Sequence, residues 1–133
     1  MIETMSLTLR LPIQVLFDGE IAKLVARDEA GSFGILPNHV DFATALVPSV
    51  VTATETGGAE RFFGVDEGVL VKRGARVEIS VRRAVAGADL DRLRATVRER
   101  FVEMDEQERQ ARASLSRLEA DLVRRFAELK DLR

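Results

Sequence analysis

The chain has 133 residues, 46% of them hydrophobic and 32% charged, a balance typical of folded, soluble proteins. Its formal net charge is -2, and acidic residues are interleaved with the basic ones, which argues against a nucleic-acid partner. The absence of cysteine excludes disulfides, thiolate metal sites and cysteine nucleophiles. No apolar run approaches the roughly 20 residues that span a bilayer, and the start lacks the features of a secretory signal. We therefore expect a cytoplasmic protein without direct membrane insertion.

The composition changes near Gly87. All nine glycines and all three prolines lie in residues 1–88, which carry 20 charged side chains, whereas residues 89–133 carry 22 in half the length. Glycine and proline punctuate turns between strands, and their absence from a highly charged segment is typical of surface helices. The pattern predicts an α+β protein with a β-sandwich at residues 1–87 and an antiparallel two-helix domain at residues 88–133.

The first part consists of short apolar runs separated by turn residues. Leu7, Leu9 and Leu11 alternate with other residues, as expected of a half-buried strand. Further strands are predicted at 15–17, 21–26, 31–39 (a strand and turn), 50–54, 61–65, 69–72 and 77–81. Hairpin turns are predicted at Asp18-Gly19-Glu20, Gly57-Gly58 and Arg73-Gly74. This spacing favours a sandwich or flattened barrel of roughly eight to ten strands.

The second part carries two apolar stripes at spacings of three and four residues, the interval that keeps side chains on one helical face. The stripes are Leu90, Leu93, Val97, Phe101 and Met104, then Leu115, Leu118, Leu122, Phe126 and Leu129. Asp89 and Asp105 are suited to begin the two helices, with a short polar turn between them. Because narrow stripes bury too little surface to offset the cost of ordering the chain, the hairpin is expected to need a neighbour. That neighbour is the β domain, another subunit, or each in turn.

Few residues suggest catalysis. A triad of His39, Asp41 and either Ser32 or Ser49 lacks the usual sequence context of a nucleophile, and a turn or surface role for His39 is preferred. Asp66 and Glu67 face opposite sides of a strand and are expected in a solvated edge or turn. The arginines that begin the first helix are read as a solvated face, with anion binding as the alternative. These are Arg92, Arg94, Arg98 and Arg100. We therefore predict that the protein is not an enzyme and acts by binding partners.

Three segments carry a resemblance to a known family. GSFGILPNH at 31–39, followed by FATAL at 42–46 and FGVDEGVLVKRG at 63–74, resembles the epsilon subunit of bacterial F-type ATP synthases. The charged helical segment agrees with this family, whose members have a β-sandwich followed by two helices. VDEG stands where the family usually has SGG, and with the arginine-rich helices it is similar to the alternate F-type ATPases associated with sodium transport.

The resemblance implies a non-catalytic rotor subunit of the central stalk that couples ion-driven rotation of the c ring to ATP synthesis and hydrolysis. The sandwich would bind the gamma subunit and rest on the c ring. The helices would reach the alpha/beta catalytic head and restrain ATP hydrolysis. The protein would then be peripheral, in the F1 sector at the cytoplasmic face of the inner membrane. The contact residues implied are Ser32, Phe33, Pro37, Asn38, His39 and Phe42, with serine at position 32 where the family often has an acidic residue.

The resemblance also implies a second function, the regulatory binding of a nucleotide. Some members bind ATP through an [IL]DxxRA motif at the start of the first helix, which residues 90–95, LDRLRA, match. The candidate ATP-binding residues are Asp91, Arg94, Ala95 and Arg98, and helix capping is the alternative role for Asp91. No cofactor is required for the rotor role. A stand-alone ATP-sensing module is the alternative function.

Overall fold

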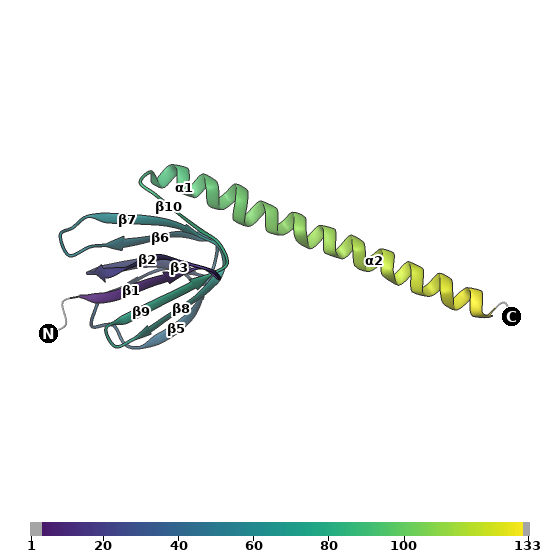
Figure 1. The fold of residues 1–133 in the computed structure, drawn as a ribbon, viewed down its shortest axis with the longest axis horizontal. Helices are drawn as coiled ribbons and strands as arrows, with labels where there is room; N and C mark the ends of the chain where they lie inside the picture. The colour runs from purple at the N-terminus through teal and green to yellow at the C-terminus, as the bar shows by residue number, and fades with distance from the viewer. Residues whose placement is uncertain (1–3, 132–133) are drawn as a thin grey trace. The chain divides into compact units, whose positions relative to one another are not determined.

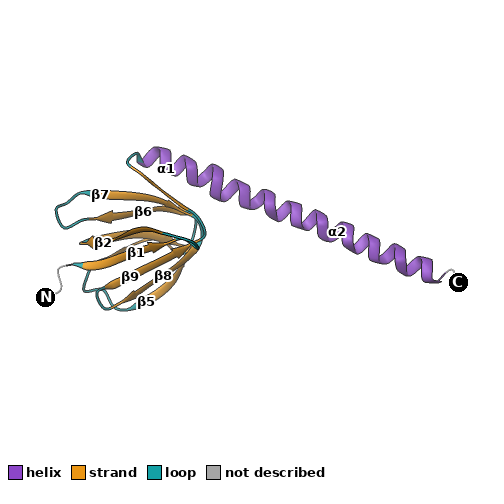
Figure 2. Ribbon diagram, in the orientation of Figure 1, coloured by secondary structure: helices purple, strands orange, loops and turns teal. Residues whose placement is uncertain are grey.

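A computed structural model describes residues 4–131, which form ten strands followed by a helical region (Figure 1; Figure 2). Within the helical region, the side chains at positions 104, 105, 112, 116 and 129–131 lie outside the described residues. The strands are β1 (Met5–Arg10), β2 (Val15–Ile21), β3 (Lys23–Asp28), β4 (Gly31–Ile35), β5 (Phe42–Leu46), β6 (Ser49–Thr54), β7 (Glu60–Val65), β8 (Gly68–Arg73), β9 (Arg76–Val81) and β10 (Ala84–Gly87). The helical segments are α1 (Leu90–Thr96), the π-helix η1 (Val97–Glu103) and α2 (Met104–Asp131).

The strands form the predicted β-sandwich. Their order is β10-β7-β6-β3-β5-β8-β9-β1-β2, with β4 paired to β3. The two halves of this path meet at a single residue pair between β3 and β5, Asp28 with Leu46. Side chains that alternate along the strands fill the space between the halves, and Leu7 and Leu9 of β1 are completely buried there. The apolar alternation that predicted β1 is therefore the pattern that builds the core.

Two of the three predicted hairpin turns are confirmed. Gly58, with φ of 92°, lies between β6 and β7, and Gly74, with φ of 58°, lies between β8 and β9, both in conformations that favour glycine. The predicted turn at residues 18–20 is wrong, because these residues lie inside β2. β2 pairs with β1 along its length, and the hydroxyl of Thr8 donates to Asp18 across the pair. Long-range pairing outweighs the local preference of Asp-Gly for a turn.

The first apolar stripe packs on the sandwich. Asp89 caps α1 as predicted, accepting hydrogen bonds from two backbone amides. Leu93, Val97 and Phe101 are each at most 6% exposed. The chain divides into two compact units, and the first extends through Val102, so that it includes these three residues together with the sandwich.

The predicted hairpin of two antiparallel helices is wrong. No turn precedes Asp105, which was expected to begin the second helix, because η1 continues directly into α2, which runs from Met104 to Asp131 (Figure 2). This segment is rich in glutamate, glutamine, arginine and alanine and has no glycine or proline. A residue suited to cap a helix, such as Asp105, does not interrupt a helix when no residue before it disfavours helical backbone. The side chain of Asp105 lies outside the described residues.

Candidate functional site

The connection between β4 and β5, residues 36–41, is called the contact loop here. It holds three of the predicted contact residues, Pro37, Asn38 and His39. Phe33 and Phe42 flank it in the two strands, with ring centroids 5.7 Å apart in an edge-to-face arrangement. The imidazole of His39 lies 4.8 Å from the ring of Phe42. The structure therefore brings five of the six predicted contact residues into one region.

The contact loop is held by a lysine that sequence reasoning missed. Lys72, at the end of β8, is 2% exposed, and its Nζ donates to the backbone carbonyl oxygens of His39 and Gly74 at 2.5 and 2.7 Å. The loop presents two apolar side chains, Leu36 and Val40, which are 57% and 74% exposed. A buried lysine within VLVKRG gives no signal in a single sequence, because lysine at a strand end is usually solvated.

The hypothetical triad does not form. Nδ1 of His39 lies 2.8 Å from the backbone carbonyl oxygen of the next residue. Asp41 accepts a hydrogen bond from the backbone amide of Gly74 at 2.7 Å. Ser32 and Ser49 line a separate cavity. The turn role preferred for His39 therefore agrees with its position.

Ser32 lies apart from the other predicted contact residues. It is the second residue of β4 and pairs with Arg27 of β3, so that both lie on the outer face of the sandwich beside the first helix. A cavity of about 400 Å³ lies there, between that face and the helical residues Arg94 and Arg98. Sequence spacing could not show this, because Arg27 and Arg94 are separated by most of the sandwich.

This cavity, called the arginine cavity here, is positively charged. Its polar lining consists of three guanidinium groups and three hydroxyl groups, from Arg27, Arg94, Arg98, Ser32, Ser49 and Thr52. Aliphatic residues that include Val25, Val50 and Val97 complete it. No acidic residue lines it, and within residues 4–131 the three arginines form no ion pair. Such a site favours an anion.

The four candidate ATP-binding residues are only partly brought together. Arg94 and Arg98 line the arginine cavity, whereas Asp91 and Ala95 are not among its lining residues. The alternative role for Asp91 is wrong, because the cap of α1 is Asp89, whose carboxylate accepts from the backbone amide of Asp91 at 3.0 Å.

An ion-pair network around one buried carboxylate links the sandwich to η1. Asp66, in the turn between β7 and β8, is fully buried, so the expectation of a solvated carboxylate is wrong although the turn is present. Its carboxylate accepts from Nε of Arg83 at 2.9 Å and from Nη2 of Arg82 at 3.2 Å. The guanidinium of Arg83 lies 5.2 Å from the centroid of the Phe101 ring. The arginines lie 16 and 17 residues further along the chain, beyond any local pattern.

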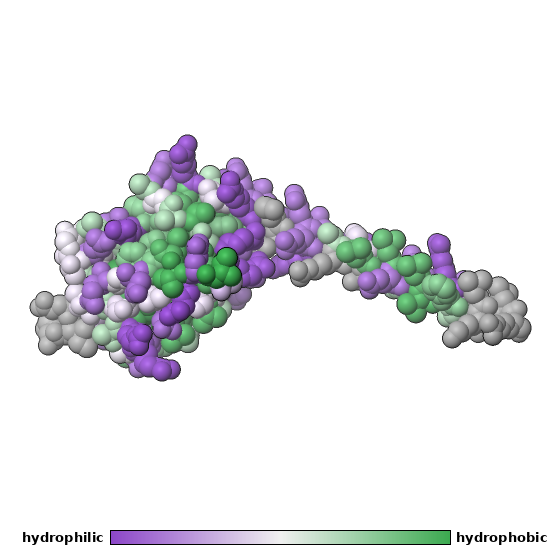
Figure 3. All heavy atoms as spheres, viewed as in Figure 1, coloured by the Kyte–Doolittle hydropathy of each residue, from purple (hydrophilic) through white to green (hydrophobic). Residues whose placement is uncertain are grey.

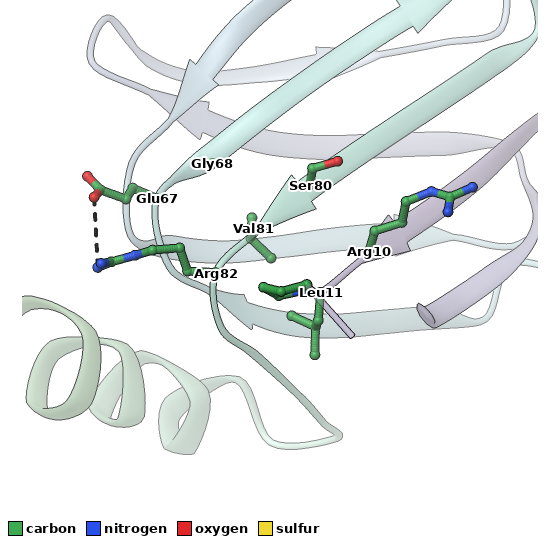
Figure 4. Close-up of a pocket in the computed structure, with 8 residues that line it drawn as sticks. Arg10, Leu11, Glu67, Gly68, Ser80, Val81 and Arg82 are labelled. Carbon is green, nitrogen blue, oxygen red and sulfur yellow. Dashed lines mark ion pairs between the residues drawn. The ribbon is translucent and has the colours of Figure 1, made fainter. Parts of the chain in front are cut away.

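A second cavity, of about 350 Å³, lies beside the start of β8. Leu11 and Val81 contribute aliphatic groups to it, and the ion pair between Glu67 and Arg82, at 3.8 Å, lies near its rim (Figure 4). Ser80 supplies a hydroxyl group to its lining. This cavity suits an apolar side chain better than a reaction.

The second apolar stripe is exposed. Leu115, Leu118, Leu122 and Phe126 lie on α2 and are between 55% and 66% exposed, within the unit that begins at Glu103. Figure 3 shows apolar residues gathered among charged ones along this helix. The predicted stripe is therefore present but forms no core; the side chain of Leu129 lies outside the described residues. Exposed apolar surface of this extent is typical of a binding face.

Neither a metal cluster nor a transmembrane helix is found in the part of the chain that the structure describes. Histidine and acidic residues do not gather there in a group that could hold a metal ion. None of its helices is both long enough and apolar enough to cross a bilayer.

Comparison with known proteins identifies relatives of the chain. The family model described as "ATP synthase, Delta/Epsilon chain, beta-sandwich domain" matches residues 4–87. A protein of Paraburkholderia xenovorans named ATP synthase epsilon chain 2 is 42% identical over 96 residues, covering 71% of this chain and 69% of the relative. A protein of Cereibacter sphaeroides with the same name is 37% identical over 111 residues, covering 80% of this chain and 76% of the relative.

Solved structures share the fold. A chain in the mitochondrial ATP synthase of Euglena gracilis superposes with a TM-score of 0.62 at 20% identity, covering 68% of this chain and 59% of that one. A chain from the central stalk and c ring of the Tetrahymena thermophila mitochondrial enzyme gives a TM-score of 0.54 at 21% identity, covering 86% of this chain and 92% of that one.

Proposed function

The chain belongs to the family of ATP synthase epsilon chains, central-stalk subunits of a rotary ATP synthase, and we propose how its surfaces serve that role. The sandwich binds the gamma subunit, and the contact loop faces the c ring. The protein is non-catalytic and peripheral, in the F1 sector at the cytoplasmic face of the inner membrane. The observation that carries this assignment of surfaces is a contact loop with exposed Leu36 and Val40 on a hydrogen-bonded support.

The expected result with gamma is a tight equimolar complex, because a folded sandwich offers a rigid surface that needs little ordering on binding. Size exclusion with light scattering on the mixed subunits measures this. Absence of association would contradict the assignment to gamma. The c-ring assignment is tested separately by Leu36→Asp with Val40→Asp, which should weaken binding to synthase depleted of this subunit while gamma binding remains.

The exposed stripe of α2 supports a regulatory role. Leu118 and Leu122 lie on the face that would dock in the alpha/beta catalytic head and restrain ATP hydrolysis. Leu118→Asp with Leu122→Asp should raise ATP hydrolysis by the assembled enzyme, because charges on that face oppose burial. Glu119→Gln, a neighbouring exposed position, is the matched control. Unchanged hydrolysis in the double variant would argue against restraint by this stripe.

The arginine cavity supports a second candidate function, the regulatory binding of ATP. Three guanidinium groups without carboxylate partners would meet the phosphates, and the hydroxyl groups and aliphatic surface would meet the remainder of the ligand. ATP therefore requires Arg27 of the sandwich as well as Arg94 and Arg98 of the helix.

Isothermal titration with ATP tests this second function. Arg94→Ala and Arg27→Ala should each weaken binding about tenfold or more, the loss of one charge-assisted contact. Arg92→Ala is the control, because Arg92 lies on the same helix but outside the arginine cavity. A protein that binds no ATP, or that binds it equally well without Arg94, would refute the nucleotide site. A chain that binds ATP but not gamma would instead be a stand-alone sensor.

A further inference from the structure

Lys72 occupies a position that the fold would normally give to an apolar residue. Along β8, Leu70 and Lys72 are both buried, at 0% and 2% exposed, whereas Val69 is 50% exposed and Val71, between the two buried residues, is only partly buried. Lys72 is therefore the last inward-facing residue of the strand, at the end where β8 turns into β9. A lysine is almost never fully buried unless its ammonium group is paired.

The partners of Lys72 are backbone oxygens of two separate connections. Its Nζ donates to the carbonyl oxygen of His39 in the contact loop at 2.5 Å, and to that of Gly74 in the β8–β9 turn at 2.7 Å. Within residues 4–131 it forms no ion pair with a carboxylate. The ammonium group therefore holds the backbone of the contact loop and of the β8–β9 turn together through hydrogen bonds.

A second hydrogen bond runs between the same two connections. The backbone amide of Gly74 donates to Oδ1 of Asp41 at 2.7 Å. Within the loop, the amide of His39 donates to the carbonyl oxygen of Leu36 at 2.9 Å and closes a turn. The loop is thus attached at His39 and at Asp41, on either side of Val40, which is more exposed than the other large apolar side chain of the loop, Leu36.

We propose that Lys72 is a positioning residue for the contact surface: it fixes the shape of the contact loop before the partner arrives, and so raises affinity without touching the partner. This inference rests on the proposed contact between that loop and the c ring. A loop held in its binding conformation avoids the ordering cost that a free loop incurs on association. Lys72 itself is inaccessible, so its removal deletes no contact with a partner.

Lys72→Met is the central variant. Methionine has a similar length and no charge, and replacing a buried charged group by an apolar one of similar volume is often tolerated. Lys23→Met is the matched control, since Lys23 is an exposed lysine that opens β3. Asp41→Ala removes the other hydrogen bond between the two connections. It should therefore also increase the mobility of the contact loop, without changing Lys72.

The first measurement is hydrogen–deuterium exchange of the isolated full-length chain. In Lys72→Met, exchange at the amides of residues 36–41 should rise about tenfold or more while the strand amides of β1 and β9 stay protected. Lys23→Met should leave the loop unchanged. Unchanged loop exchange in Lys72→Met would overturn the proposal, and this measurement involves no partner.

The second measurement is binding of the full-length chain to ATP synthase depleted of this subunit. Lys72→Met should weaken binding about tenfold, equivalent to about 1.4 kcal/mol, mainly through faster dissociation. If exchange rises and affinity stays the same, while Leu36→Asp with Val40→Asp weakens binding, Lys72 holds the loop but its support does not raise affinity, and the proposal is overturned. If the double aspartate variant also binds normally, the proposed contact surface itself fails, and the role of Lys72 fails with it.

Discussion

The two apolar stripes of the helical region have the same spacing and similar residues, yet they differ in burial. Phe101 of the first stripe is 3% exposed, and Phe126 of the second is 66% exposed. The first stripe meets Gly64 and Gly87, where a Cβ would come within 3.1 Å of side-chain atoms of Val97 and Leu93 respectively. Helical period therefore makes a stripe available for packing, but a surface shaped to receive it decides whether it packs.

The largest expected effect comes from truncation. Ending the chain after Gly87 removes the buried first stripe and should lower the free energy of unfolding by about 4 kcal/mol, the burial of three apolar side chains less the cost of ordering them. Ending it after Val102 removes only the second unit and should leave that free energy unchanged within about 0.5 kcal/mol. Urea denaturation of both truncated chains measures this. Equal stabilities would contradict the difference between the stripes.

Phenylalanine substitutions compare the stripes at one residue each. Phe101→Ala should destabilise the chain by about 3 kcal/mol, because a buried aromatic ring is replaced by a cavity. Phe126→Ala should change stability by less than about 0.5 kcal/mol, because its ring is mostly in water. Urea denaturation measures both changes in the free energy of unfolding, from the shift of the midpoint when the dependence on urea concentration is unchanged. A comparable loss in Phe126→Ala would show that the second stripe is also packed.

The buried carboxylate of Asp66 is the next test. Asp66→Asn should cost about 2 kcal/mol, because it removes the charge that pairs with two arginines, one of which lies over the ring of Phe101. Glu67→Gln should cost less than about 0.5 kcal/mol, since Glu67 is 53% exposed at its side chain and pairs with Arg82 at 3.8 Å. The midpoint temperatures of thermal unfolding of the two variants measure this difference. If the two variants unfold alike, the network does not hold the first helix.

The smallest expected effect is at the glycine beneath the first stripe. Gly64→Ala should destabilise by about 1 kcal/mol, because the added methyl lies 3.1 Å from Cγ2 of Val97 and tightens a packed contact. Gly57→Ala is the control, since nothing lies within 4 Å of a Cβ at that position. Denaturation of both variants gives the comparison. Full tolerance at Gly64 would show that the helix shifts easily on the sandwich.

Local patterns predicted the parts of this protein that depend on neighbouring residues. Strand alternation, the hairpin glycines Gly58 and Gly74, and the cap at Asp89 are confirmed. The errors arose where distant residues compete with a local preference. The Asp-Gly pair of β2 is extended because β1 pairs with it, and Asp66 is buried because Arg82 and Arg83 reach it.

In the candidate sites, too, local features were predicted and features that depend on distant residues were missed. The contact loop was predicted from its sequence, and its role as a partner surface remains a prediction. Its support by Lys72 was not predicted, because a lysine at a strand end is solvated in most folds. The arginine cavity was half predicted: Arg94 came from the motif and Arg98 was a candidate beside it, whereas Arg27 is supplied by a strand more than 60 residues earlier in the chain.

The amino-acid sequence by itself determined that this protein is a β-sandwich followed by a helical region, and it carried the motif that places the chain among ATP synthase epsilon chains. The fold class rests on periodicity and turn chemistry, which act over a few residues, whereas the family placement rests on the resemblance of residues 31–46 and 63–74. Only the tertiary structure decided which stripe is buried, which charges are paired and what holds the contact loop. Those outcomes depend on surfaces that meet only when segments far apart in the chain are brought together.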